Sequence, residues 1–176
     1  MGPATPDCPP DRLTDARPGA AIAWRDAVSV GVADPDIACS MLLRAAALAP
    51  ENASIHVKIG SIWLDRLDFA RAAAAFDTAL RTDPTLDDAR LGLARCWNRL
   101  GRHADVPELI EAATMPMSSH GFYLRGIAAL CGGRTESAER DFHAALADDP
   151  LHREAAFELG RILRASGRHG ELGGLC

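Results

Sequence analysis

The side chains that most often bind metals or act as nucleophiles are scattered along this chain. The six histidines are His56, His103, His120, His143, His152 and His169. They occur without an H-E-x-x-H motif and without a cysteine at metal-ligand spacing. The five cysteines form no C-x-x-C pair, so neither a disulfide framework nor a zinc site is predicted. We expect Cys39, Cys96 and Cys131 to be buried free thiols.

Motifs for catalysis and nucleotide binding are missing as well. The sequence contains no G-x-S-x-G, no phosphate loop and no dinucleotide fingerprint. The glycines of "CGGR", residues 131–134, are typical of a turn between two helices. The sequence therefore predicts no catalytic site and no bound cofactor or metal ion.

Two pairs of arginines indicate a binding chemistry. Arg95 and Arg99 are four residues apart, and Arg161 and Arg164 are three apart, so each pair shares one face of a helix. Guanidinium groups form charge-assisted and often bidentate hydrogen bonds with carboxylates. These residues are therefore candidates for binding an acidic partner.

Composition favours a helical protein that does not bind polyanions. Only 5% of the residues are aromatic although 48% are hydrophobic, so the core must be built from Ala, Leu, Ile and Val, which suits helices. A net charge of −5 does not favour nucleic acid or an anionic membrane. The N-terminus lacks a secretory signal and no segment approaches ~20 apolar residues, so we expect a cytoplasmic protein. Abundant arginine with one lysine, Lys58, is typical of a GC-rich bacterial genome.

Residues that end helices recur with a period near 34. Pro50, Pro84 and Pro150 are separated by 34 and 66 residues, and the second interval is twice 33. Gly-Arg dipeptides begin at residues 101, 133 and 167, separated by 32 and 34 residues. Such a period predicts a repeat protein in which each unit is a small helical motif stacked on the next.

Aligned on this period, the chain resembles the tetratricopeptide repeat (TPR) family, whose repeat is a pair of antiparallel helices with small and large residues at fixed positions. The best matches lie in segments 53–86 and 119–152. The matching residues are Ile59, Gly60, Trp63, Ala72, Phe76, Ala79 and Pro84, then Gly126, Ala138, Phe142, Ala145 and Pro150. The resemblance implies an all-α fold, a right-handed α-solenoid of antiparallel helix pairs that forms a superhelix.

The TPR-like domain is expected to span residues 19–176, after a flexible, proline-rich lead-in of residues 1–18. Its repeats are a degenerate N-terminal repeat 19–52, three full repeats 53–86, 87–118 and 119–152, and a partial repeat 153–176. Terminal repeats are often atypical, which accounts for the weak signature of the first one. Pro107 falls in the first turn of one second helix, so we expect that helix to be shortened.

Alanine recurs where neighbouring helices must approach each other closely. Residues 69–84 read "FARAAAAFDTALRTDP". Alanine gives good helix propensity but little apolar area, so its advantage is that it lets two helices lie close together. We expect the first helix of a repeat to place its large residue in a notch between small residues of the second, with Ala72 and Ala79 at this joint.

In this architecture the first helices of successive repeats line the concave face of the solenoid. They contain nine Arg or Lys and five Asp or Glu, whereas the second helices with their turns contain five and eleven. The family pattern points these residues into the groove: Arg95, Asn98, Arg99, Tyr123, Ile127, Leu130, Arg161 and Arg164. A locally basic groove of this kind suits an acidic peptide with a central apolar residue. The alternative is that the arginines are solvated or pair with acids of neighbouring helices.

Two functional interpretations follow. The first is a non-catalytic protein–protein interaction or scaffold module that holds a peptide or protein in this groove. The second is an N-terminal targeting or dimerisation segment of a larger bacterial enzyme, such as a sulfotransferase or glycosyltransferase. Some TPR domains bind heat-shock chaperones through a Lys and Asn clamp, which this chain lacks. The corresponding positions hold Val57, Ser61, Gly92, His120 and Leu124.

The partial last repeat supplies one helix over residues 153–166 and too short a tail for a second. The apolar face of that helix, with Phe157, Leu159, Ile162 and Leu163, is expected to be incompletely covered. The sequence therefore predicts self-association through this end, or a partner that covers it.

Overall fold

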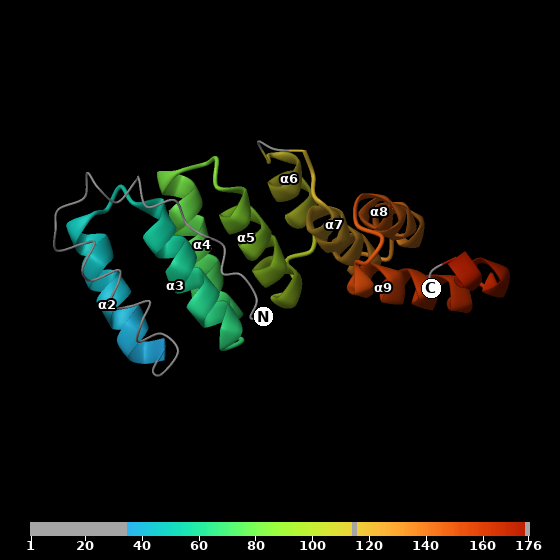
Figure 1. Ribbon diagram of the computed structural model, residues 1–176, viewed down its shortest axis with the longest axis horizontal. Coiled ribbons are helices and arrows are strands. Elements are labelled where there is room, and N and C mark those ends of the chain that lie inside the picture. Colours follow the sequence, from blue (N-terminus) through green and yellow to red (C-terminus); the bar gives the residue numbers. More distant parts are fainter. Residues whose placement is uncertain (1–34, 114–115, 175–176) are drawn as a thin grey trace, which may run out of the picture.

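Capping side chains and helix-ending turns divide the chain into short helices. The structure is a computed structural model that describes residues 35–113 and 116–174. Within these ranges the elements are α2 (Pro35–Leu48), α3 (Ala53–Asp65), α4 (Phe69–Thr82), α5 (Asp87–Arg99), α6 (Val106–Glu111), α7 (Ser119–Cys131), α8 (Thr135–Asp148), α9 (Arg153–Ala165) and the 3-10 segment η2 (His169–Gly174) (Figure 1). The predicted all-α fold is confirmed. The lead-in of residues 1–18, the weak first helix near residues 21–34, Cys8 and Cys176 lie outside the described residues.

The helix boundaries follow from local backbone chemistry. The residues whose side chains cap a helix N-terminus are Asn52, Asp68, Ser118 and His152. At the other end, Gly101, Gly133 and Gly167 of the recurring Gly-Arg pairs have φ of 80°, 74° and 73°. In the turn between α3 and α4, Leu67 occupies the position of the glycine, with φ of 60°. In all four turns the next N–H donates to a carbonyl oxygen five residues earlier, at 2.8–2.9 Å, which closes the helix.

The helices form two layers. Helix α3 contacts α5, and α5 contacts α7, so these helices lie side by side in a first layer that α9 continues (Figure 1). In the second layer, α4 packs on α3 and α5, α6 on α5 and α7, and α8 on α7 and α9. The chain thus alternates between layers as it advances, which is the topology of an α-solenoid.

Glycine, more than alanine, brings the two layers together. The ring of Phe76, on α4, is buried between α3 and α5. A Cβ atom added at Gly60 would lie 2.7 Å from Phe76 Cε1, and one at Gly92 would lie 2.6 Å from Phe76 Cζ. The expectation that a first helix supplies the large residue is therefore wrong at this joint, because the ring comes from the second layer. Ala72 and Ala79 are fully buried on the same helix as the ring.

A similar joint recurs between α7 and α8. Phe142 of α8 is fully buried, and a Cβ atom added at Gly126 would lie 2.6 Å from its Cε1. Ala138 and Ala145 are fully buried in the same cluster. A large ring flanked by small residues is therefore the repeated unit of packing in this fold.

Helix α6 is shortened, as Pro107 led us to expect. It has six residues, whereas α4 and α8 have 14 each, and Pro107 lies in its first turn. Val106 and Ile110 anchor it in a cluster with Ala94 and Leu124. The second layer is therefore thinner between α4 and α8 than elsewhere.

The apolar face of α9 is better covered than the sequence indicated. Leu159, Ile162 and Leu163 are 0%, 6% and 1% exposed, because they pack in one cluster with residues of α7 and α8. Phe157 alone among the four predicted residues is exposed, at 60%. The premise for self-association, a bare apolar helix, is therefore wrong for three of its four residues.

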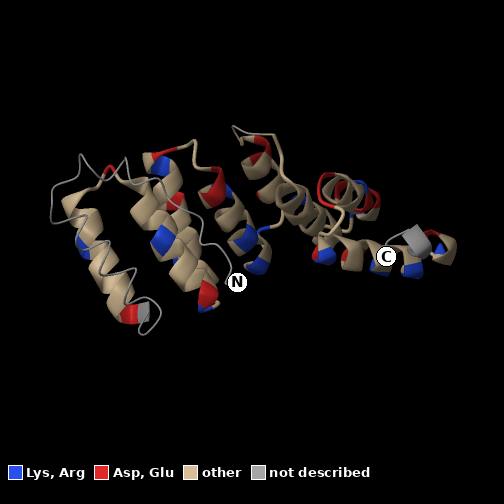
Figure 2. Ribbon diagram, viewed as in Figure 1, with Lys and Arg blue, Asp and Glu red and all other residues tan. Residues whose placement is uncertain are grey.

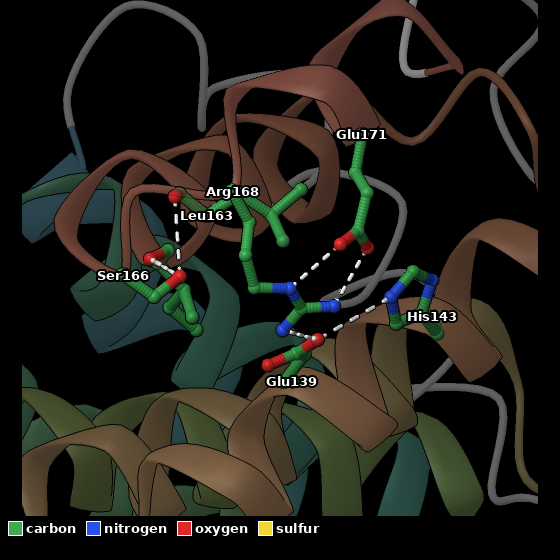
Figure 3. Close-up of polar contacts among 7 residues, drawn as sticks. Glu139, His143, Leu163, Ser166, Arg168 and Glu171 are labelled. Carbon is green, nitrogen blue, oxygen red and sulfur yellow. Dashed lines mark hydrogen bonds and ion pairs between the residues drawn. The ribbon is translucent and has the colours of Figure 1, made fainter.

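An ion-pair cluster holds the chain that follows α9. The guanidinium of Arg168 donates to Glu139 of α8 at 2.7 Å and to both carboxylate oxygens of Glu171 at 2.7 and 2.6 Å (Figure 3). These hydrogen bonds raise the pKa of Arg168 and lower the pKa of Glu171. His143 Nε2 lies 3.9 Å from the same Glu139 oxygen. The cluster ties η2 to α8 at the surface.

The prediction for the cysteine thiols holds for two of three. Cys39 and Cys96 are buried, and burial raises the pKa of the Cys96 thiol to about 11. Cys131 is exposed instead of buried, because it is the last residue of α7 and adjoins the solvent-exposed turn to α8.

Candidate protein-binding surface

Helix α5 contributes two arginines to the exposed face of the first layer. Arg95 is exposed, and no Asp or Glu in the described part of the chain forms an ion pair with it. After burial and the charge of His152, the charge of Arg95 also helps to lower the pKa of His120 on α7. The guanidinium carbon of Arg99 lies 5.0 Å from the ring centre of Phe69, at the start of α4, in a cation–π contact.

Asn98 belongs to the scaffold and does not offer its amide to a ligand. Its Nδ2 donates to the carbonyl oxygen of Leu124 at 2.8 Å, and its Oδ1 lies 3.2 Å from Nδ1 of His103. The side chain thus links α5 to α7 and to the turn before α6. Its polar atoms thus already have partners at the joint between repeats, while its place in a groove stays a prediction.

Tyr123 is the centre of an aromatic cluster between α7 and α9. Its ring centre lies 5.1 Å from that of His152, 5.9 Å from that of His120 and 6.1 Å from that of Phe142. The two imidazoles stack with centres 6.0 Å apart. In the sequence these two histidines are far apart and show no pairing motif. Their separation of 32 residues, close to the repeat period, is the signal that would have paired them.

Ile127 and Leu130 continue the same side of α7 as half-buried side chains. They pack against the cluster that contains Leu159 and Leu163, so part of their apolar surface is already used inside the fold. The apolar strip that a partner could contact is therefore narrower than three full side chains.

Charges of both signs surround Tyr123. Burial raises the pKa of Tyr123, and the charges of Glu158 and Glu154 on α9 act in the same direction, while Arg95 and Arg99 oppose them. Burial lowers the pKa of His120 as well, with His152 as the next largest cause. The tyrosine thus lies between the arginines of α5 and the glutamates of α9.

The arginines of α9 do not form a free basic pair. Nη1 of Arg161 lies 2.6 Å from Glu158 Oε2 one turn earlier, so its charge is compensated within the helix. Arg164 is exposed, and no ion pair involves it among the described residues. In Figure 2, blue segments mark α5 and α9, whereas α8 carries several red segments. The first layer is thus basic at α5 and mixed at α9.

The described residues form neither a metal site nor a membrane span. Within residues 35–113 and 116–174, no group of three His, Cys, Asp or Glu side chains is arranged to hold a metal ion. None of the helices in these ranges has the length and apolar character that a membrane span requires.

Comparison with known families identifies the repeat. One sequence model described as tetratricopeptide repeat matches residues 30–87 and 123–171, and a second matches residues 64–117. The first alone spans more than half of the chain. The chain belongs to the tetratricopeptide repeat family. This TPR protein therefore has the architecture of a protein–protein interaction scaffold.

Solved structures share the TPR fold with this chain. MamA residues 41 to the end, from Desulfovibrio magneticus RS-1, aligns with a TM-score of 0.81 at 17% identity, over 91% of this chain and 92% of its own. PilW, a widely conserved type IV pilus biogenesis factor, aligns at 0.76 and 21%, over 91% and 76%. PilF of Pseudomonas aeruginosa aligns at 0.76 and 16%, over 89% and 75%. Identities this low show the fold alone. Among curated proteins, no relative matches this TPR chain.

Proposed function

We infer that this TPR protein acts by holding a protein or peptide partner against α5 and α7, with Arg95 and Tyr123 at the centre of the contact. The observation that carries this inference is an exposed guanidinium on α5 without an acidic partner in the described residues, together with a half-buried tyrosine on the adjoining helix α7. Arginine and tyrosine are the residue types that dominate binding energy at protein interfaces. A carboxylate of the partner pairs with Arg95, and an apolar side chain covers the tyrosine ring.

The distribution of charge restricts where the partner is acidic. On the α5 side, Arg95 and Arg99 attract carboxylates. On the α9 side, Glu154 Oε2 lies 3.4 Å from Nδ1 of His152, whose ring packs on Tyr123, and it repels them, whereas Glu158 is paired with Arg161. We therefore narrow the predicted acidic peptide to one whose acids contact α5, while its remaining residues are neutral or basic where they approach α9.

A charge-reversal variant tests this surface. Arg95→Glu combined with Arg99→Glu is compared with the unaltered chain for binding to a library of acidic peptides, by fluorescence anisotropy. The proposal expects affinity to fall by about tenfold or more, because two attractive charges become repulsive. The matched control is Arg44→Glu with Arg81→Glu, which makes the same change in net charge at exposed positions of α2 and α4.

Two results would contradict the proposal. Unchanged binding of the peptides to the Arg95 and Arg99 variant would remove the site. An equal loss in the Arg44 and Arg81 control would show that net charge alone governs binding. Circular dichroism of each variant verifies that the helices are intact.

The interpretation as an N-terminal segment of a larger bacterial enzyme stays a prediction, as does a cytoplasmic location. The enzyme interpretation was based on an apolar face of the last helix that no other helix covers. Leu159, Ile162 and Leu163 of that face are buried, so this basis is reduced to Phe157. Reading the gene beyond codon 176 tests it. A stop codon there would remove the enzyme interpretation, whereas several hundred further residues of mixed α/β pattern would support it.

A further inference from the structure

The shortened helix α6 adjoins a hollow in the second layer. The hollow has a volume of about 500 Å³ and is bounded by α6, α7 and α8. Pro107, Ala129 and Ala144 provide small apolar surfaces along its lining. A second-layer helix of 14 residues, such as α4 or α8, would present eight more residues at this position than α6 does. Eight residues correspond to about 12 Å of helix.

An ion-pair network of one arginine and two carboxylates lines part of this hollow. Arg125 of α7 donates from Nε and Nη2 to the two carboxylate oxygens of Asp141 at 3.0 and 2.6 Å, and from Nη1 to Glu111 at 3.4 Å. Asp141 is buried on α8, and its hydrogen bonds raise the pKa of Arg125. The single arginine is paired with two carboxylates, so the trio keeps one net negative charge, at the exposed side chain of Glu111, and an acidic ligand must contact the hollow away from that residue.

Two further arginines lie at the rim without acidic partners. Arg134 and Arg140 line the hollow and are exposed. Nη2 of Arg140 donates to Ser137 Oγ at 3.2 Å. In the described ranges of the chain, neither guanidinium forms an ion pair with an Asp or Glu. The hollow therefore has an uncompensated positive rim around a partly apolar lining.

We propose that this hollow is a second binding site, which takes an acidic segment of a partner protein. Carboxylates of the segment pair with Arg134 and Arg140, and a small apolar side chain between them rests on the half-buried Ala144. The lining residues of α8 run from residue 137 to 144, about 10 Å along the helix, which matches two turns of an incoming helix. The volume is within the range of about 300–1,000 Å³ for ligand sites.

The chemistry favours a peptide segment over a free anion. A lone anion would use the arginines but leave the apolar lining uncovered, whereas a segment with Glu and Ala side chains satisfies both. The site is distinct from the α5 and α7 surface, because it is built from α6, α8 and the second-layer side of α7. The failure of one site therefore leaves the other standing.

The test is a titration of the isotope-labelled full chain, followed by backbone amide shifts, with the capped peptide Ac-EALAEAL-amide. The matched probe Ac-QALAQAL-amide has the same apolar residues without the charges. We expect the acidic peptide alone to shift amides of residues 129 and 134–144. Arg134→Glu with Arg140→Glu is expected to weaken its binding at least tenfold. Ala144→Trp, which keeps both arginines but fills the hollow, is expected to weaken it equally.

Each alternative occupant gives a different result. Shifts in α5 and around Tyr123 that Arg95→Glu abolishes, with none at residues 129 and 134–144, would overturn this site while supporting the proposed function. Equal shifts with the glutamine peptide would overturn the role of the arginines. Shifts of residues 134–144 on raising the protein concentration without peptide would assign the hollow to a second copy of this chain. Unimpaired binding by Ala144→Trp would show that the arginines act without the hollow.

Discussion

Replacing Gly60 by alanine tests the central packing joint of the fold. The added methyl would lie 2.7, 2.8 and 2.9 Å from the Cε1, Cδ1 and Cζ atoms of Phe76. Carbon atoms that are not bonded to each other prefer about 3.5–4.0 Å. The ring cannot move away from α3, because a methyl's width of space is also missing at Gly92 on the opposite side.

Two opposing contributions set the magnitude. Overpacking of a core costs about 1–3 kcal/mol. Replacing a glycine inside a helix by alanine stabilises the helix by about 1 kcal/mol. The expected result for Gly60→Ala is a net loss of about 1 kcal/mol in the free energy of unfolding. In a chain of this size such a loss lowers the melting temperature by about 2–4 °C.

A double-mutant cycle measured by urea unfolding separates the two contributions. Phe76→Ala removes the ring and is expected to cost about 3–5 kcal/mol by itself. In that background Gly60→Ala should become stabilising by about 1 kcal/mol, because only the gain in helix propensity remains. The effect of Gly60→Ala on the free energy of unfolding therefore changes sign when the ring of Phe76 is removed.

The reasoning about this joint has a clear point of failure. A stabilising effect of Gly60→Ala in the unaltered chain would show that Phe76 has room to move. A penalty of the same size with and without the ring would show that its origin lies elsewhere in α3.

Three further predictions concern single positions. Leu67→Gly should raise the free energy of unfolding in urea by about 0.5–1 kcal/mol, since it relieves a left-handed side chain that is largely exposed; a lower stability would contradict this. Ala72→Leu should destabilise by about 1–3 kcal/mol because its site is fully buried, whereas Ala74→Leu, on the exposed face of the same helix, should change stability little; equal thermal shifts would refute the assignment of faces. Burial lowers the pKa of His120 below its usual 6.5 in the folded protein. As pH falls through 6.5, the unfolded chain therefore binds a proton more readily than the folded one does, and the stability present above pH 6.5 is lost below it. Unfolding measured between pH 7.5 and 5 should show a smaller loss for His120→Asn, and an identical loss would falsify this origin.

Local signals in the sequence predicted the helices and the family. The Gly-Arg pairs mark turns that need a positive φ, and that requirement is a property of single residues. Likewise, Pro107 predicted a short α6 because a proline restricts the backbone wherever it occurs. The signature of Gly60, Ala72 and Ala79 led to the TPR family because small residues are required at every joint of such a stack.

The binding surfaces were predicted less well, because they depend on which side chains meet across helices. Asn98 and Arg161 match the groove pattern, yet one binds a backbone carbonyl of α7 and the other binds Glu158. The hollow beside α6 was not predicted at all. Arg134 and Arg140 line it only because α6 is too short to cover that part of the second layer. The spacing of residues in the sequence does not reveal which arginines lack an acidic partner in the folded protein.

The sequence by itself determined that this protein is a stack of helix pairs with a period near 34, because helix ends and small contact residues are encoded at each repeat. The tertiary structure decided that the ring of Phe76 enters from the second layer and that three of the four apolar residues of α9 are buried. It also decided which arginines, such as Arg161, form ion pairs with acidic side chains. The physical reason is that propensity and turn geometry act between near neighbours along the chain. Burial and ion pairing depend on distances between residues that only the stacked helices bring together.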